Sequence, residues 1–131
     1  MTNEKKIEWL LRIGVAGEFL GHGLLAIGYN FSLVEPMLIP KADWVKWMVQ
    51  LTHVSSGVAT NLMIVIGCLD VIVAMIVLFR PIRPVLLWAT FWGFWTALVR
   101  PLVGVCWLDF IERFANWAAP LALYFNLDKS K

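Results

Sequence analysis

Long apolar stretches separated by short polar segments form the main pattern of this chain. An α-helix needs about 20 mainly apolar residues to cross a bilayer. Four stretches reach that length, at about 7–28, 54–79, 85–103 and 107–126. The fourth is the most polar, since charged residues occupy its first turns, but its second half is apolar. The pattern predicts an all-α membrane protein, a single domain over residues 1–131 that forms an antiparallel four-transmembrane-helix bundle.

A long connection, residues 30–53, joins the first two predicted spans. Its second half mixes Trp44 and Trp47 with Lys46 among apolar residues. Tryptophan and lysine together are typical of segments that lie in the membrane interface. We therefore expect a short interfacial helix in this connection.

Basic residues are unevenly divided between the two predicted sides of the membrane. Cytoplasmic segments of membrane proteins carry an excess of Lys and Arg. The connection at 30–53 has Lys41 and Lys46, whereas more basic residues fall on the side with both termini and the 80–84 turn. We predict a multi-pass protein of a cell (inner) membrane, with both termini cytoplasmic. The residues on that richer side are Lys5, Lys6, Arg80, Arg83, Lys129 and Lys131.

Composition agrees with a membrane location. The chain is 60% hydrophobic and 15% charged, and a soluble domain of this size has too little interior to bury so much apolar surface. The net charge of +2 gives no basic surface for nucleic acid. We therefore expect the lipid bilayer as a partner, together with a second copy of the chain or other membrane subunits, and no nucleic acid.

Leaving aside Glu8 at its boundary, the first predicted span contains three ionisable residues, Arg12, Glu18 and His22. A charge at membrane depth costs about 3 kcal/mol on insertion scales unless it is paired or neutralised, so such residues are candidates for a functional site. Glu18 and His22 share a helix face with Gly17 and Gly21. Small residues in this spacing let another helix approach closely, which predicts that the face is turned into the bundle.

Depth along the helices, at about 1.5 Å per residue, predicts two polar clusters. The inner cluster is an ion pair between Arg12 and Asp70. The outer cluster consists of His22, Arg100, Glu112 and Arg113, and Glu18 lies beneath it near the midplane. Asn116 is a further candidate, because Pro120 lacks the N–H that would bond to the Asn116 carbonyl. Buried ion pairs can also simply fix helix register. We assign no catalytic residue and no metal site.

The run LLRIGVAGEFLGHGLLAIGY, residues 10–29, begins Leu-Leu-Arg and continues to Phe-Leu-Gly-His-Gly. It resembles the first helix of the DoxX-like family, small four-helix membrane proteins in which Leu-Leu-Arg is followed by Phe-Leu-x-His-Gly. The matching residues include Arg12 and His22, and Asp70 stands where the second helix of the family often carries an acid. The segment FIERFANWAAPLALYF also resembles last helices of the family. The connection at 30–53 and Glu18 depart from its pattern.

The resemblance implies a role near membrane redox chemistry, because some members of the family are subunits of a thiosulfate:quinone oxidoreductase. A quinone needs an apolar slot with one or two polar groups at its carbonyls. His22 is the candidate donor to one carbonyl, and Arg100 or Arg113 would stabilise the reduced, anionic form. Glu18 would carry a proton. We therefore expect a quinone-associated subunit or accessory protein of a membrane redox system, with quinone as the candidate cofactor.

Two other functions stay open at this point. The small size of the chain and the outward Trp and Phe surface of the third span suit a non-catalytic structural or assembly subunit of a larger membrane complex. A small proton-coupled transporter is the second alternative, because small multidrug exporters are also four-helix chains with one Glu in the first helix, as Glu18 is here. Whether the chain is an enzyme is likewise open.

Overall fold

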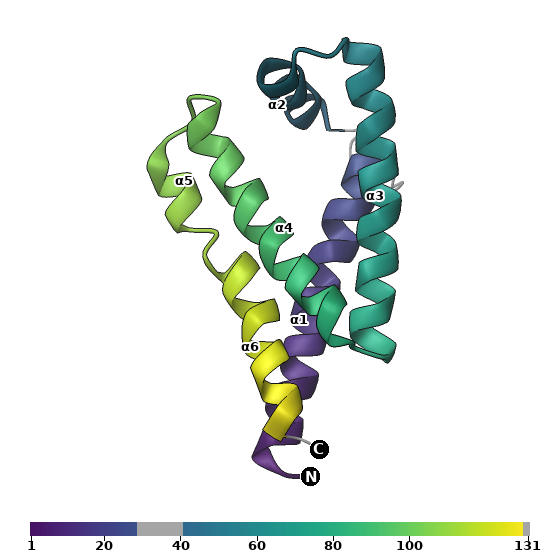
Figure 1. The fold of residues 1–131 in the computed structure, drawn as a ribbon, viewed down its shortest axis with the longest axis vertical. Coiled ribbons are helices and arrows are strands. Elements are labelled where there is room, and N and C mark those ends of the chain that lie inside the picture. The colour runs from purple at the N-terminus through teal and green to yellow at the C-terminus, as the bar shows by residue number, and fades with distance from the viewer. Residues whose placement is uncertain (29–40, 130–131) are drawn as a thin grey trace, which may run out of the picture. The chain divides into compact units, whose positions relative to one another are not determined.

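The computed structural model describes residues 1–28 and 41–129, and these residues are almost entirely helical (Figure 1). The all-α fold predicted from the sequence is confirmed for this part of the chain. Residues 29–40, the first half of the long connection, lie outside the described residues. The helices are α1 (Asn3–Ile27), α2 (Ala42–Thr52), α3 (Ser56–Phe79), α4 (Arg83–Leu102), α5 (Trp107–Ile111) and α6 (Ala115–Lys129).

Three of these helices are long and apolar enough to cross a membrane, namely α1, α3 and α4. They coincide with the first three predicted spans to within four residues at each end. Their outward side chains are largely apolar, as shown by Val65, Ile72 and Phe91, which are all more than half exposed. Apolar exposure of this kind is expected in contact with lipid rather than water. The chain is therefore a helical membrane protein.

The predicted fourth span is not one continuous helix, and the prediction is wrong on that point. A turn at residues 112–114 separates α5 from α6. In this turn the N–H groups of Arg113 and Phe114 reach back only three residues, to carbonyls at 3.3 and 3.2 Å. With 15 residues α6 extends about 22 Å, whereas the hydrocarbon core is about 30 Å thick. Neither α5 nor α6 can cross alone.

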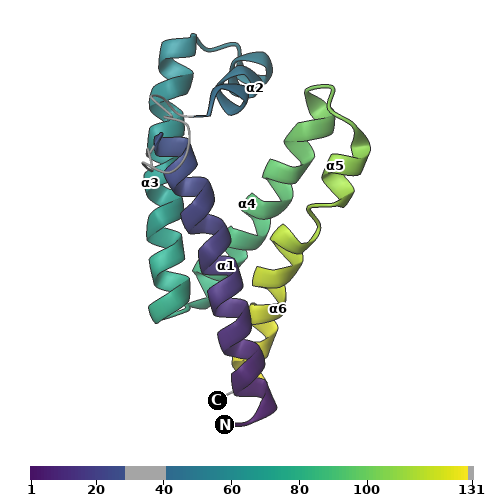
Figure 2. The ribbon, with the colours of Figure 1, turned by 180° about the vertical axis from the view of Figure 1, so that it is seen from behind.

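The chain divides into two compact units, and helices α1 and α3 contribute to both. Unit 1 comprises residues 1–18 and the chain from Val73 onward. In this unit α4 packs along α6 and also contacts α5, and α4 and α6 lie side by side in Figures 1 and 2. One stripe of residues three or four apart in the sequence forms the buried side of α4. Its buried members are Ala89, Gly93 and Arg100, joined by Leu86 and Ala97.

At Gly93 the backbones of α4 and α6 approach each other closely. A Cβ atom added at Gly93 would lie 2.7 Å from the Asn116 carbonyl carbon and 3.2 Å from the Trp117 nitrogen. Any larger residue would hold the two backbones apart, so glycine sets their spacing. The Asn116 carbonyl, which Pro120 cannot satisfy, is therefore covered by the α4 backbone.

Unit 2 comprises residues 19–72. The helix predicted in the long connection is confirmed as α2, and its apolar side packs on a small core made by the end of α1 and the start of α3. The end of α1 crosses α3 closely, since a Cβ atom on Gly67 would lie 2.6 Å from the Gly23 carbonyl oxygen. The core residues are Ala26, Val45, Ala59 and Met63, flanked by Trp44, Met48, Val49, Val54 and Ile66.

Candidate functional site

A group of charged residues lies in unit 1 where α4 ends and α5 leads into α6. Arg100 is buried in the last turn of α4, and its Nη1 donates to the Thr96 carbonyl at 2.6 Å. The charges of Asp109, Glu112 and Arg113 all act on the Arg100 guanidinium. The structure thus brings together three members of the predicted outer cluster, Arg100, Glu112 and Arg113, and adds Asp109.

Aromatic rings of α4, α5 and α6 and the turn between α5 and α6 contact one another beside these charged residues in the sequence. Phe110 of α5 meets Phe94 of α4 edge-to-face, with ring centroids 5.8 Å apart, and meets Phe114 at 5.1 Å. Trp117 of α6 contacts both Phe94 and Phe114, at 6.3 and 5.6 Å. We call the whole set the polar–aromatic junction. It consists of Phe94, Arg100, Asp109, Phe110, Glu112, Arg113, Phe114 and Trp117.

Two nitrogen atoms of the polar–aromatic junction lack a hydrogen-bond partner. Arg113 Nε and Trp117 Nε1 are both buried, and neither has an acceptor among the residues that the structure describes. The other end of the Arg113 guanidinium lies 3.9 Å from Glu112 Oε1. A buried donor without an acceptor costs about 1–3 kcal/mol. The two N–H groups are therefore available to an acceptor other than the described residues.

Sequence reasoning did not single out Trp117 as a site residue. It stands directly after Asn116, which was chosen for its carbonyl, and it was counted only as part of an apolar helix. Its signal is the indole N–H, because a buried tryptophan normally finds a hydrogen-bond partner. Asn116 itself lies half-buried, with its main chain against Gly93.

His22 and Glu18, the candidates on α1, fall in different units. In unit 2 the His22 ring packs edge-to-face on Trp44 of α2, with centroids 5.7 Å apart. Glu18 is half-buried at the end of the unit 1 part of α1. The outer cluster was predicted to combine His22 with the residues that lie in unit 1, with Glu18 beneath them. This grouping stays a prediction. The contact with Trp44 was not expected, because the interfacial helix was considered only as a membrane anchor.

Arg12 is buried in unit 1, and all three guanidinium nitrogens donate within that unit. Nε and Nη2 donate to the Leu78 carbonyl, Nε at 3.0 Å, and Nη1 donates to Glu8 Oε1 at 3.3 Å. Leu78 lies one residue before the end of α3, where main-chain carbonyls have no partner in their own helix. Arg12 thus caps α3. Lys5 also bonds Glu8, at 3.0 Å.

Asp70 belongs to unit 2, so the predicted ion pair between Arg12 and Asp70 joins the two units and stays a prediction. The Asp70 side chain is buried, and its Oδ1 has no hydrogen-bond partner among the described residues. Glu8 was set aside in the sequence as a boundary residue. Its position four residues before Arg12, the usual spacing of a helical ion pair, was the signal that could have identified it.

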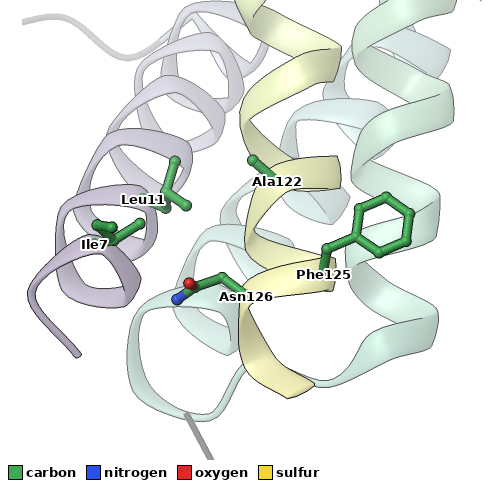
Figure 3. A pocket seen from close by; sticks show the side chains of 5 residues that line it. All are labelled: Ile7, Leu11, Ala122, Phe125 and Asn126. Carbon is green, nitrogen blue, oxygen red and sulfur yellow. The ribbon is translucent and has the colours of Figure 1, made fainter. Parts of the chain in front are cut away.

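An open groove of about 310 Å³ lies between α1 and α6 in unit 1 (Figure 3). Ile7 and Leu11 of α1 form one wall, and Ala122 and Asn126 of α6 form the other, with Phe125 at the rim. The Asn126 amide points toward α1 and donates to the Glu4 carbonyl at 3.0 Å. The groove contains none of the candidate residues chosen from the sequence, and its lining offers no charged group.

Within residues 1–28 and 41–129, no three His, Cys, Asp or Glu side chains are grouped so that they could hold a metal ion. No protein-family model, no curated protein and no solved structure matches this chain.

Proposed function

We propose that this chain is a DoxX-like integral membrane protein that serves as a quinone-associated subunit or accessory protein of a membrane redox system. The observation that carries the proposal is the pair of buried donors without acceptors, Arg113 Nε and Trp117 Nε1, in the polar–aromatic junction. A quinone presents two carbonyl acceptors on a flat apolar ring. Aromatic walls with one or two polar groups are the lining that such a ligand requires.

The charges of the polar–aromatic junction support the same ligand. Arg100 and Arg113 place two guanidinium groups in a largely apolar setting, where they favour negative charge on a nearby oxygen. Glu112 is the candidate to pass a proton to a quinone held by Arg113, because its Oε1 lies 3.9 Å from the Arg113 guanidinium. A bound quinone supplies the redox chemistry, and these residues bind it, orient it and supply protons.

The same proposal includes a membrane topology. We propose that α5 and α6 together complete a fourth crossing, with the turn at 112–114 inside the bilayer and the polar–aromatic junction around it. Exposed apolar side chains on both helices, such as Leu108, Ile111 and Phe125, suit lipid contact. The excess of Lys and Arg beside both termini supports a cytoplasmic location for these ends, in a cell (inner) membrane.

The test is quinone retention by the purified protein. After extraction in mild detergent, bound quinone is measured by solvent extraction and mass spectrometry. We expect wild-type protein to retain quinone, and Arg113→Gln and Trp117→Phe to lose most of it, because each variant removes one of the two donors. Arg80→Gln and Trp95→Phe are matched controls, since these residues are exposed and lie outside the junction.

Two results would count against the proposal. One is wild-type protein that retains no quinone after reconstitution with excess quinone. The other is retained quinone that all four variants hold equally well.

A structural or assembly subunit is a second candidate function, and the Arg12 network favours it. Arg12 uses every guanidinium nitrogen to join α1 to the end of α3 and to Glu8. A buried polar side chain used in this way holds two helices together and does not bind a ligand. If co-purification yields membrane subunits but no quinone, this function is the better explanation, alone or with association between copies of the chain.

A further inference from the structure

Asp70 is the single charged residue between Ser56 and Phe79, the whole length of α3. It lies nine residues from the C-terminal end of this helix, which is about 13 Å at 1.5 Å per residue. Its side chain is buried, with only 4% of the residue exposed. The site proposed for quinone has no use for it.

The surroundings of Asp70 in unit 2 are tightly packed and apolar. The α1 backbone lies directly against this part of α3, since a Cβ atom on Gly23 would meet Val71 Cγ2 at 2.9 Å and Asp70 Cβ at 3.1 Å. It would also lie 2.8 Å from the Gly67 carbonyl oxygen. Contacts this close leave no space for a water molecule between the two helices at this point.

Among the described residues of unit 2, no cation is placed to balance a negative charge on Asp70. On the α1 part of this unit the one ionisable residue is His22, whose ring packs on Trp44. The ionisable residues on α2 and at its two caps are all exposed, and Lys41 lies over the Trp44 ring. They are Lys41, Asp43, Lys46 and His53. Asp70 Oδ1 accordingly has no donor among the described residues.

The cation predicted as its partner, Arg12, is already engaged elsewhere. Its three guanidinium nitrogens donate to Leu78 and Glu8 within unit 1. Glu18, further along α1, is itself an acid and supplies no positive charge. A buried carboxylate without a partner is so unfavourable that the group binds a proton instead.

We propose that Asp70 is a proton-binding site inside α3, which holds its carboxyl as the neutral acid at neutral pH. The ligand is a proton, and the residue gives the chain a protonatable group at membrane depth. The proposal is independent of quinone binding, because it uses no residue of the polar–aromatic junction. It is an alternative to the predicted ion pair with Arg12.

The test is infrared spectroscopy of the full chain in lipid nanodiscs at neutral pH. A protonated carboxyl has a C=O stretching band that is separate from the carboxylate bands and shifts in D₂O. We expect this band in wild-type protein and its loss in Asp70→Asn, which keeps the shape of the neutral acid. Glu18→Gln is the matched control, and it should leave the Asp70 band in place. The proposal would be overturned if Glu18→Gln removes the band and Asp70→Asn leaves it unchanged. It would also be overturned if wild-type protein shows only carboxylate bands.

A second measurement needs no variant. Dicyclohexylcarbodiimide, an apolar carbodiimide, reacts with neutral carboxyls in membranes. The acid proton moves to a nitrogen of the reagent while the carboxyl oxygen adds to its central carbon, and rearrangement gives an N-acylurea that keeps all atoms of both partners. We expect peptide mapping of labelled wild-type protein to find the adduct on Asp70. An adduct on Glu18 with none on Asp70 would contradict the proposal.

Discussion

Replacing Gly93 by alanine tests the packing that positions the polar–aromatic junction. The new Cβ atom would lie 2.7 Å from the Asn116 carbonyl carbon, whereas ordinary van der Waals contacts begin at 3.4 Å. The backbone of α6 would have to move by roughly 0.7 Å, and a gap of this size removes about a quarter to a half of the attraction between atoms packed nearby. Overpacking of this kind costs about 1–3 kcal/mol.

Alanine also has an opposite effect, because it favours helix over glycine by about 1 kcal/mol. Gly14→Ala is the matched control, since Gly14 lies inside α1 and a Cβ atom there would meet nothing within 4 Å. The free energy of unfolding of both variants is measured by reversible titration with SDS in mixed micelles, followed by circular dichroism. We expect Gly93→Ala to be less stable than Gly14→Ala by about 1–3 kcal/mol. Equal free energies for the two variants would refute the close approach of α4 and α6.

The same titration with SDS tests three other contacts. Arg12→Gln should lower the free energy of unfolding by about 3 kcal/mol, because it removes the donors to the Leu78 carbonyl and the ion pair with the buried Glu8 carboxylate. A change below about 1 kcal/mol would contradict the capping role. Trp44→Ala should lower the free energy of unfolding by about 2 kcal/mol, since the ring is half-buried. It should also shift the NMR signals of the His22 ring, and unchanged signals would exclude the contact between the two rings. Asn126→Ala should cost about 1 kcal/mol through the lost bond to α1, and no loss would show that this bond contributes nothing.

Much of the helical framework follows from the distribution of apolar residues. The runs that became α1, α3 and α4 are long enough to span a membrane, and their length alone distinguishes them from soluble helices. The mixture of tryptophan and lysine around Trp44 was enough to predict α2.

The break between α5 and α6 could not be predicted from composition. The segment around Glu112 and Arg113 is apolar enough overall to be read as one span, and the turn depends on the hydrogen bonds that these residues make locally. Pro120 was a partial signal, but it lies beyond the turn. Apolar content measures how favourable a membrane location is, and it does not report helix continuity.

The partners of Arg12 illustrate a second limit. Depth arguments compare side chains on different helices, so they led to Asp70. The observed acceptors are the Leu78 carbonyl, a main-chain group at a helix end, and Glu8 on the same helix. Main-chain carbonyls at helix ends occur in every sequence and leave no compositional mark. Trp117 escaped notice for a similar reason, since its indole N–H matters only once burial has removed its partners.

The most direct test of quinone binding at the polar–aromatic junction is photolabelling with a photoreactive quinone analogue, followed by peptide mapping. The account predicts an adduct within residues 107–117 that excess unlabelled quinone prevents and that Arg113→Gln removes. An adduct confined to the groove of Ile7 and Leu11, or labelling that unlabelled quinone does not reduce, would contradict it.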